Sequence, residues 1–216
     1  MVSLTHDEDA TGRVRVWDPL VRIGHWVLVA AFAAAYLTEG EPEWLHSWSG
    51  YAIAITVALR IVWGFIGPEH ARFADFVTGP GRVFSYLAAL VSGRAERHIG
   101  HSPAGGAMTL ALFAALAVTT FSGMATLAVE DGSGPLAGII VQAPAESFSS
   151  FPALEGTAGE EGGVRQKREN VWEEVHEVSA NLSLALIVLH ILGVGLASLA
   201  HRENLPRSMI TGQKRA

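Results

Sequence analysis

One stretch decides the fold: residues 175–200 read VHEVSANLSLALIVLHILGVGLASLA. The stretch is longer than the roughly 20 apolar residues that a helix needs to cross about 30 Å of hydrocarbon. It nevertheless contains two histidines, His176 and His190. Ionisable residues inside a membrane span are costly and are functional candidates by default. The stretch therefore predicts a transmembrane helix that carries a functional site.

Three other segments have the same apolar character, which gives predicted spans at about residues 20–38, 45–66, 105–129 and 175–200. Half of the 216 residues are hydrophobic and only 17% are charged, whereas about a quarter of the residues of a soluble domain are charged. We expect an all-α integral membrane protein, with a single domain over residues 1–216 folded as a four-helix bundle. A soluble helical bundle is the alternative.

Basic residues predict the orientation, because loops rich in Lys and Arg stay in the cytoplasm. Such residues precede the first span, separate the second from the third and follow the fourth: Arg13, Arg15, Arg22, Arg72, Arg82, Arg94, Arg97, Arg202, Arg207, Lys214 and Arg215. Both termini are therefore predicted to be cytoplasmic, in a protein that crosses a bacterial inner membrane four times.

The two long connections differ in character. The outer loop, about residues 130–174, is rich in Gly, Ser, Pro and acidic residues, and we expect it to be partly irregular because of its length. Residues 72–101 are expected to hold one amphipathic helix at the cytoplasmic membrane surface.

The chain has no cysteine. This excludes disulfides, thiolate metal sites, iron–sulfur clusters and covalently attached c-type haem. Any redox centre must therefore be held by histidine or methionine.

Four histidines fall within the predicted spans or at their ends. His176 and His190 are fourteen residues apart, which in a helix is about 21 Å of rise with an angular offset of about 40°. Because the fourth span begins outside, His176 lies at the level of His46, and His190 lies at the level of His25. Each pair can bind the two axial faces of one haem iron. The pattern predicts two b-type haems; a cation transporter would need intramembrane carboxylates, which are absent.

Two arginines are candidate partners for the haem propionates. Arg60 follows His46 by fourteen residues and shares its helix face at the inner level, and Arg22 precedes His25 by one turn. Each could equally extend along the helix to the membrane surface. His101, just before the third span, is interpreted as a residue of the helix start, with a quinone or propionate contact as the alternative.

The motifs resemble those of the bacterial cytochrome b561 family, which includes the cytochrome b subunits of nickel–iron hydrogenases. They cover nearly the whole chain: VWDPLVRIGHW, HSWSGYAIAITVALRIVWGFIG, ARFADF, GHSPAGGAM, HEVSANLSLALIVLHILGVGLAS and HRENLPRSMITGQKR. The resemblance implies a four-helix diheme membrane cytochrome whose iron ligands fall on His25, His46, His176 and His190. The outer segment, about residues 130–170, looks longer than the family requires.

The expected function is electron transfer in a respiratory chain, between the membrane quinone pool and a periplasmic redox protein, either a c-type cytochrome or a hydrogenase. The acidic outer face favours a basic partner. We expect contacts with lipid, no nucleic-acid partner and no catalytic residue, and the oligomeric state stays open. An electron-transfer subunit is favoured over a stand-alone enzyme.

Two alternatives remain. A superoxide:quinone oxidoreductase would need a positive funnel for its anionic substrate, which only Arg165, Lys167 and Arg168 offer on the outer side. A non-redox haem-binding membrane anchor is the other alternative.

Overall fold

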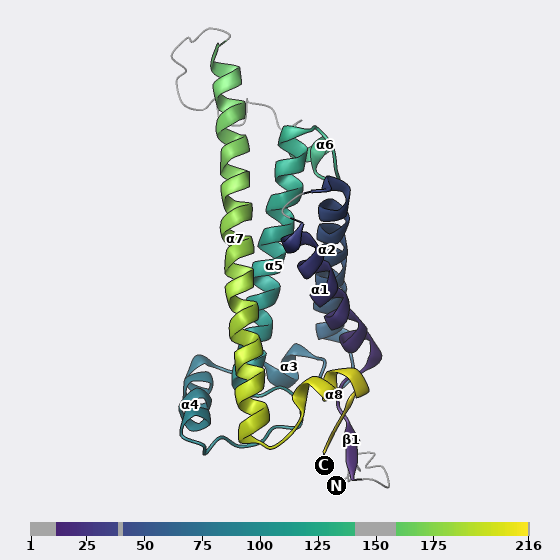
Figure 1. Ribbon diagram of the computed structural model, residues 1–216, viewed down its shortest axis with the longest axis vertical. Coiled ribbons are helices and arrows are strands. Elements are labelled where there is room, and N and C mark those ends of the chain that lie inside the picture. Colours follow the sequence, from purple (N-terminus) through teal and green to yellow (C-terminus); the bar gives the residue numbers. More distant parts are fainter. Residues whose placement is uncertain (1–11, 39–40, 141–158, 216) are drawn as a thin grey trace. The chain divides into compact units, whose positions relative to one another are not determined.

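The computed structural model describes residues 12–38, 41–140 and 159–215, with the side chains of residues 159–170 outside the description. Its longer helices are α1 (Pro19–Leu37), α2 (Glu43–Ile66), α4 (Pro80–Val91), α5 (Pro103–Glu130) and α7 (Gly159–Ala200), shown in Figure 1. Shorter elements are α3 (Phe73–Phe76), α6 (Ala137–Ile140), α8 (Leu205–Thr211) and the strands β1 (Arg13–Arg15) and β2 (Gln213–Arg215).

Four helices of the described chain are long and apolar enough to cross a membrane: Pro19–Leu37, Glu43–Ile66, Pro103–Glu130 and Val171–Ala200. The predicted all-α class and all four predicted spans are therefore confirmed. The side of the membrane on which the termini lie stays a prediction. β1 and β2 pair in antiparallel register, Val14 opposite Lys214, so the two described chain ends lie together (Figure 1).

The outer segment is more helical than expected. Helix α7 has 42 residues, about 63 Å at 1.5 Å per residue, and it includes residues 159–174 of the predicted loop. Those residues are rich in Glu, Gln, Lys and Arg, which are good helix formers, and extending an existing helix avoids the cost of nucleation. Residues 141–158 of the predicted loop lie outside the described residues.

Residues 72–101 contain the predicted helix, α4, and also the single turn α3. One side of α4 is buried through Tyr86 and Leu90, while Phe84 and Val91 are exposed. The predicted helix is therefore present, and its amphipathic character stays a prediction. Its position at a membrane surface stays a prediction.

The chain divides into two compact units. Unit 1 comprises Met1–Ala114 and Leu184–Ala216, and unit 2 comprises Ala115–Ser183, so α5 and α7 each contribute to both. The core of unit 1 includes Val16, Trp17, Val21 and Ala71. Trp17 donates its indole N–H to the Ser208 hydroxyl at 3.3 Å, which ties the start of α1 to α8.

Unit 2 is packed through small and hydroxylated residues. Ser122 of α5 and Ser183 of α7 are fully buried, and the hydroxyls of Thr119 and Ser183 are 3.3 Å apart. Small residues let helix backbones approach closely where no hydrophobic effect drives association. In unit 2, this packing brings the backbone of α5 within reach of side chains on α7.

The start of α1 depends on Asp18. Its carboxylate accepts hydrogen bonds from the amides of Leu20 at 2.9 Å and Val21 at 3.2 Å, which caps the helix. Pro19, in the first turn, lacks the amide hydrogen that would otherwise need a partner. The second carboxylate oxygen accepts from the indole of Trp63 on α2 at 3.3 Å. One side chain thus caps α1 and links it to α2.

We expect Asp18→Ala to lower the free energy of unfolding by about 1–2 kcal/mol, because both the cap and the Trp63 acceptor are lost. Asp18→Asn should lose less, since its amide oxygen still caps the helix. Thermal unfolding in detergent, followed by tryptophan fluorescence, measures both. Equal losses in the two variants would contradict the capping role.

Candidate functional site

His25 on α1 and His190 on α7 both belong to unit 1 and are close enough to interact electrostatically. The ring of His25 meets Trp26 edge-on, with 5.2 Å between ring centroids. Its Nδ1 is buried and has no hydrogen-bond partner among the described residues. A buried nitrogen without a hydrogen-bond partner is costly. The described residues therefore do not satisfy all the polar atoms of the His25 and His190 pair.

His46 lies in the first turns of α2, and its orientation is set by α1. Its Nδ1 lies 3.0 Å from the carbonyl oxygen of Ala35. A carbonyl oxygen can only accept, so Nδ1 donates in this contact. Histidines that bind metals are commonly oriented by such a hydrogen bond.

His176 has the same arrangement within unit 2. Its Nδ1 lies 2.9 Å from the carbonyl oxygen of Thr119 on α5. Gly123, one turn further along α5, faces the ring, since a Cβ added there would lie 2.8 Å from His176 Cε1. The third span therefore positions the His176 ring through its backbone. His46 and His176 belong to different units, so their pairing stays a prediction.

Space is available beside two of the four histidines. Gly50 follows His46 by one turn and Gly193 follows His190 by almost one turn. A Cβ added at either glycine would meet nothing within 4 Å. The helix faces next to these imidazoles are therefore open, as a flat ligand lying against them requires.

Arg60 is buried, with only 6% of its surface exposed. Its guanidinium lies 6.0 Å from the ring centroid of Phe73 and 5.7 Å from that of Phe113, distances at which a cation is attracted to an aromatic face. Its Nη1 has no hydrogen-bond partner among the described residues. The side chain thus lies inside unit 1 rather than in solvent.

Arg22 is held by the C-terminal part of unit 1. Its Nη2 donates to the carbonyl oxygen of Ile210 on α8, and its buried Nε has no hydrogen-bond partner in the described part of the chain. This contact connects α1 to α8. A contact with a haem propionate stays a prediction for both arginines.

His101 packs as an aromatic residue. Its ring lies between Trp17, at 4.7 Å between centroids, and Phe76, at 4.3 Å. Burial, together with the positive charge of Arg60, lowers the pKa of His101 to about 3. The ring is therefore neutral at physiological pH.

Sequence reasoning did not identify the groups that orient the histidines. The carbonyls of Ala35 and Thr119 carry no side-chain signal, because every residue has a carbonyl. Gly123 was visible as a glycine within the third span, but its role depends on contact with a helix more than 50 residues away. These contacts appear only in the folded chain.

The arrangement suits a metal that is already held by another ligand. In the described part of the chain, no group of three or more His, Cys, Asp or Glu residues could hold a metal ion. Imidazole is a common ligand for iron. Single imidazoles that are not grouped with other metal-binding side chains fit a porphyrin-held iron better than a cage for a bare ion.

A comparison with protein-family models matches residues 16–212 to the family described as prokaryotic cytochrome b561. No curated protein and no solved structure matches the chain.

The lowered pKa of His101 predicts a pH-dependent stability. The unfolded chain binds a proton at His101 below about pH 6.5, while the folded protein binds it only near pH 3. The stability is therefore complete above pH 6.5 and falls as the pH drops, by up to about 1.4 kcal/mol per pH unit. We expect His101→Phe to have a shallower dependence than the wild type in thermal unfolding between pH 7.5 and 5. Parallel curves would contradict this role.

Proposed function

The chain belongs to the prokaryotic cytochrome b561 family, and from this membership and the histidine geometry we propose that it is a diheme electron relay. As a member of the family it is a multi-pass membrane cytochrome that binds haem b and takes part in electron transfer. The proposal adds two haems, held by His25 with His190 and by His46 with His176. It further assigns exchange of electrons between the quinone pool and a periplasmic redox protein, across the bacterial inner membrane.

The observation that carries the proposal is the shared orientation of His46 and His176. Each directs its Nδ1 to a backbone carbonyl, at 3.0 Å and 2.9 Å. Each ring is therefore oriented by a backbone carbonyl of the protein itself, and Nε2 is the atom that would bind the iron in the proposed complex. Preorganised ligands bind with a smaller loss of conformational freedom.

The second pair is supported by different evidence. His25 and His190 interact within unit 1, and the open space next to Gly193 lies almost one turn from His190. The buried Nδ1 of His25 has no hydrogen-bond partner among the residues that the structure describes. A cofactor between the two helices would fill this space.

Arg60 supports a charged cofactor at the same level. A buried cation is costly unless it is paired, and its aromatic neighbours offset only part of this cost. We infer that a haem propionate accepts a hydrogen bond from Nη1 of Arg60, which has no partner among the described residues. Arg22 is assigned the weaker role of a second propionate contact, because one of its nitrogens already binds Ile210.

A haem held by two histidines would supply a one-electron redox centre with no open position for substrate. The protein contributes the positions of the ligands and the apolar surroundings. Residues fourteen apart on α7 present His176 and His190 about 21 Å apart along the helix. Two haems at these levels would divide the path of an electron across the membrane into shorter transfer steps.

The proposed partner is basic. The start of the second span contains Glu41 and Glu43, and the charged residues of the 130–174 segment are mainly acidic. Complementary charge would therefore guide a lysine-rich c-type cytochrome to this side. A hydrogenase is the other candidate. Copurification from solubilised membranes with each partner distinguishes them.

Haem counting tests the proposal. Purified wild-type protein should contain two haems per chain, measured by the pyridine haemochrome assay, with low-spin reduced-minus-oxidised spectra. His190→Ala and His176→Ala should each retain about one haem, because each removes one axial ligand of a different site. Two haems retained in both variants would overturn the ligand assignment, and a wild type without reducible haem would overturn the relay.

Gly123→Ala provides a finer test of the outer pair. Its added methyl would lie 2.8 Å from the His176 ring, so the ring must turn away from its ligand position. We expect one of the two low-spin signals in electron paramagnetic resonance to shift or weaken while the other is unchanged. Gly195→Ala is the control, because its Cβ meets nothing within 4 Å. If both variants behaved like the wild type, Gly123 would have no part in positioning His176.

A further inference from the structure

Helix α7 ends in a turn that normally requires glycine. The amide of Arg202 donates to the carbonyl of Leu199 at 3.3 Å, and the amide of Glu203 donates to that of Ser198 at 3.0 Å. These two bonds define a Schellman motif, in which the residue after the cap adopts a left-handed conformation and is usually glycine. Here that residue is Arg202, with φ of 51°. The chain therefore has an arginine at a backbone conformation that favours glycine.

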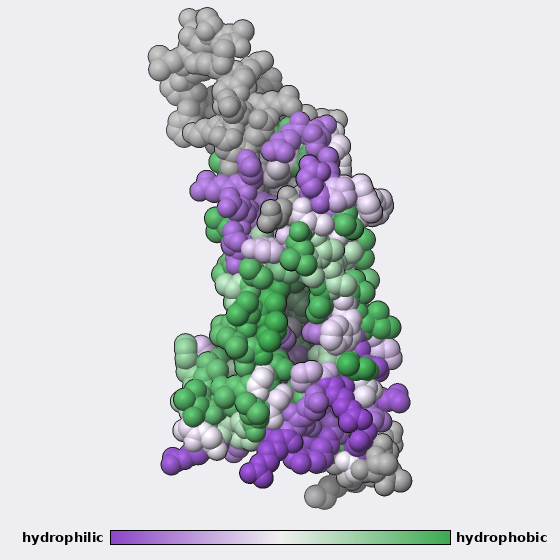
Figure 2. Space-filling model, in the orientation of Figure 1, coloured by the Kyte–Doolittle hydropathy of each residue, from purple (hydrophilic) through white to green (hydrophobic). Residues whose placement is uncertain are grey.

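Arg202 lines a cavity of about 370 Å³ at this end of unit 1. Its other basic residues come from β1, α8 and β2: Arg13, Arg207, Lys214 and Arg215. Its single carboxylate, Glu203, lies in the turn between α7 and α8. We call this site the basic groove. Figure 2 shows hydrophilic residues gathered at this end of unit 1, next to the hydrophobic end of α7.

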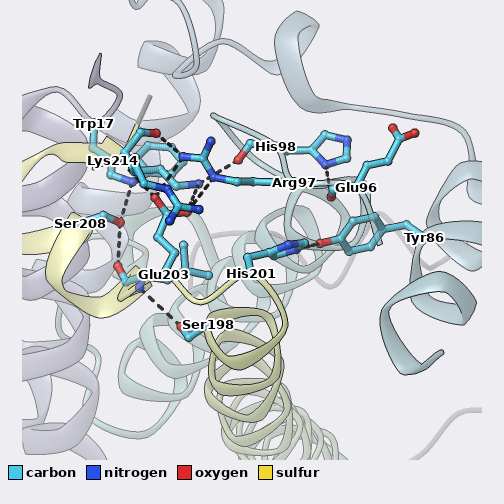
Figure 3. A network of polar contacts seen from close by, with 12 residues as sticks. Trp17, Tyr86, Glu96, Arg97, His98, Ser198, His201, Glu203, Ser208 and Lys214 are labelled. Atoms are coloured by element: carbon cyan, nitrogen blue, oxygen red, sulfur yellow. Dashed lines mark hydrogen bonds and ion pairs between the residues drawn. The ribbon is translucent and has the colours of Figure 1, made fainter. Parts of the chain in front are cut away.

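The carboxylate does not neutralise the groove, because it is already paired. Glu203 accepts from Arg97 at 3.3 Å and lies 3.8 Å from the Lys214 ammonium (Figure 3). Burial alone would raise the pKa of Glu203, but the hydrogen bond from Arg97 and the charge of Lys214 lower it below its usual value. Within the described chain, Arg202 and Arg207 form no ion pair. The groove therefore has an excess of positive charge.

Exposed apolar residues lie close in sequence to the residues of the groove. Leu199, three residues before Arg202, is 79% exposed, and Ile210 of α8, next to Thr211 of the groove, is 58% exposed. The candidate spanning segment of α7 ends at Ala200, two residues before Arg202. An occupant that satisfies both surfaces has an anionic head and apolar chains.

We propose that the basic groove binds a phosphate group, presented by the headgroup of an anionic phospholipid. Guanidinium groups recognise phosphate oxygens through paired N–H donors. The exposed side chains of Leu199 and Ile210 accept the acyl chains. The left-handed Arg202 is explained by this ligand, because its side chain supplies a donor that glycine at the same position could not.

The test uses the full-length, haem-loaded protein in phosphatidylcholine nanodiscs, with phosphatidylglycerol added as the probe. We expect phosphatidylglycerol to raise the melting temperature and to be retained in native mass spectra. Arg202→Gly should weaken its binding at least fivefold without lowering the melting temperature in pure phosphatidylcholine, because glycine is favoured at this backbone conformation. Arg207→Gln should also weaken binding.

Arg94→Gln is the matched control. It removes one positive charge from an exposed site outside the groove, and binding should stay within twofold of the wild type. Equal binding by wild type, Arg202→Gly and Arg207→Gln would overturn the site. Inorganic phosphate without lipid is the last arm: if it gave the same rise in melting temperature as phosphatidylglycerol, the ligand would be a free phosphate and the lipid assignment would be wrong.

Discussion

An imidazole within an apolar helix has two ring nitrogens, and hydrocarbon offers neither a donor nor an acceptor for them. A buried polar group without a partner costs about 1–3 kcal/mol. His46 and His176 satisfy one nitrogen with a backbone carbonyl, of Ala35 and of Thr119. The requirement to satisfy both nitrogens thus determines how neighbouring helices must approach, and it explains the small residues near these positions.

Close helix approach has its own physical conditions. In unit 2, Ser122 and Ser183 are fully buried, and Gly123 leaves room for the ring of His176. A larger residue at any of these positions would move the α5 carbonyl away from the imidazole. The third span therefore contributes to the site through a backbone carbonyl and through small residues that leave room for the His176 ring.

The end of unit 1 that contains the chain termini depends on polar contacts instead. Asp18 caps α1 and accepts from Trp63, and Glu203 joins Arg97 to Lys214 (Figure 3). The first contact joins α1 to α2, and the second joins the C-terminal segment to the connection before α5. Glu203 and Lys214 also line the basic groove, together with Arg202 and Arg207. Stability and the proposed lipid contact therefore share one network.

The sequence by itself determined the four spans, the family and the spacing of the four histidines, because hydrophobicity and helix periodicity are local properties. The tertiary structure alone decided which groups each histidine meets. His176 and the carbonyl of Thr119 are 57 residues apart, and Trp17, typical of a membrane surface by sequence, is buried against Ser208 from 191 residues away. The helical start of α7 was also missed, because charged residues continue a helix without an apolar pattern. Contacts between distant residues depend on how helices pack, and no local pattern encodes them.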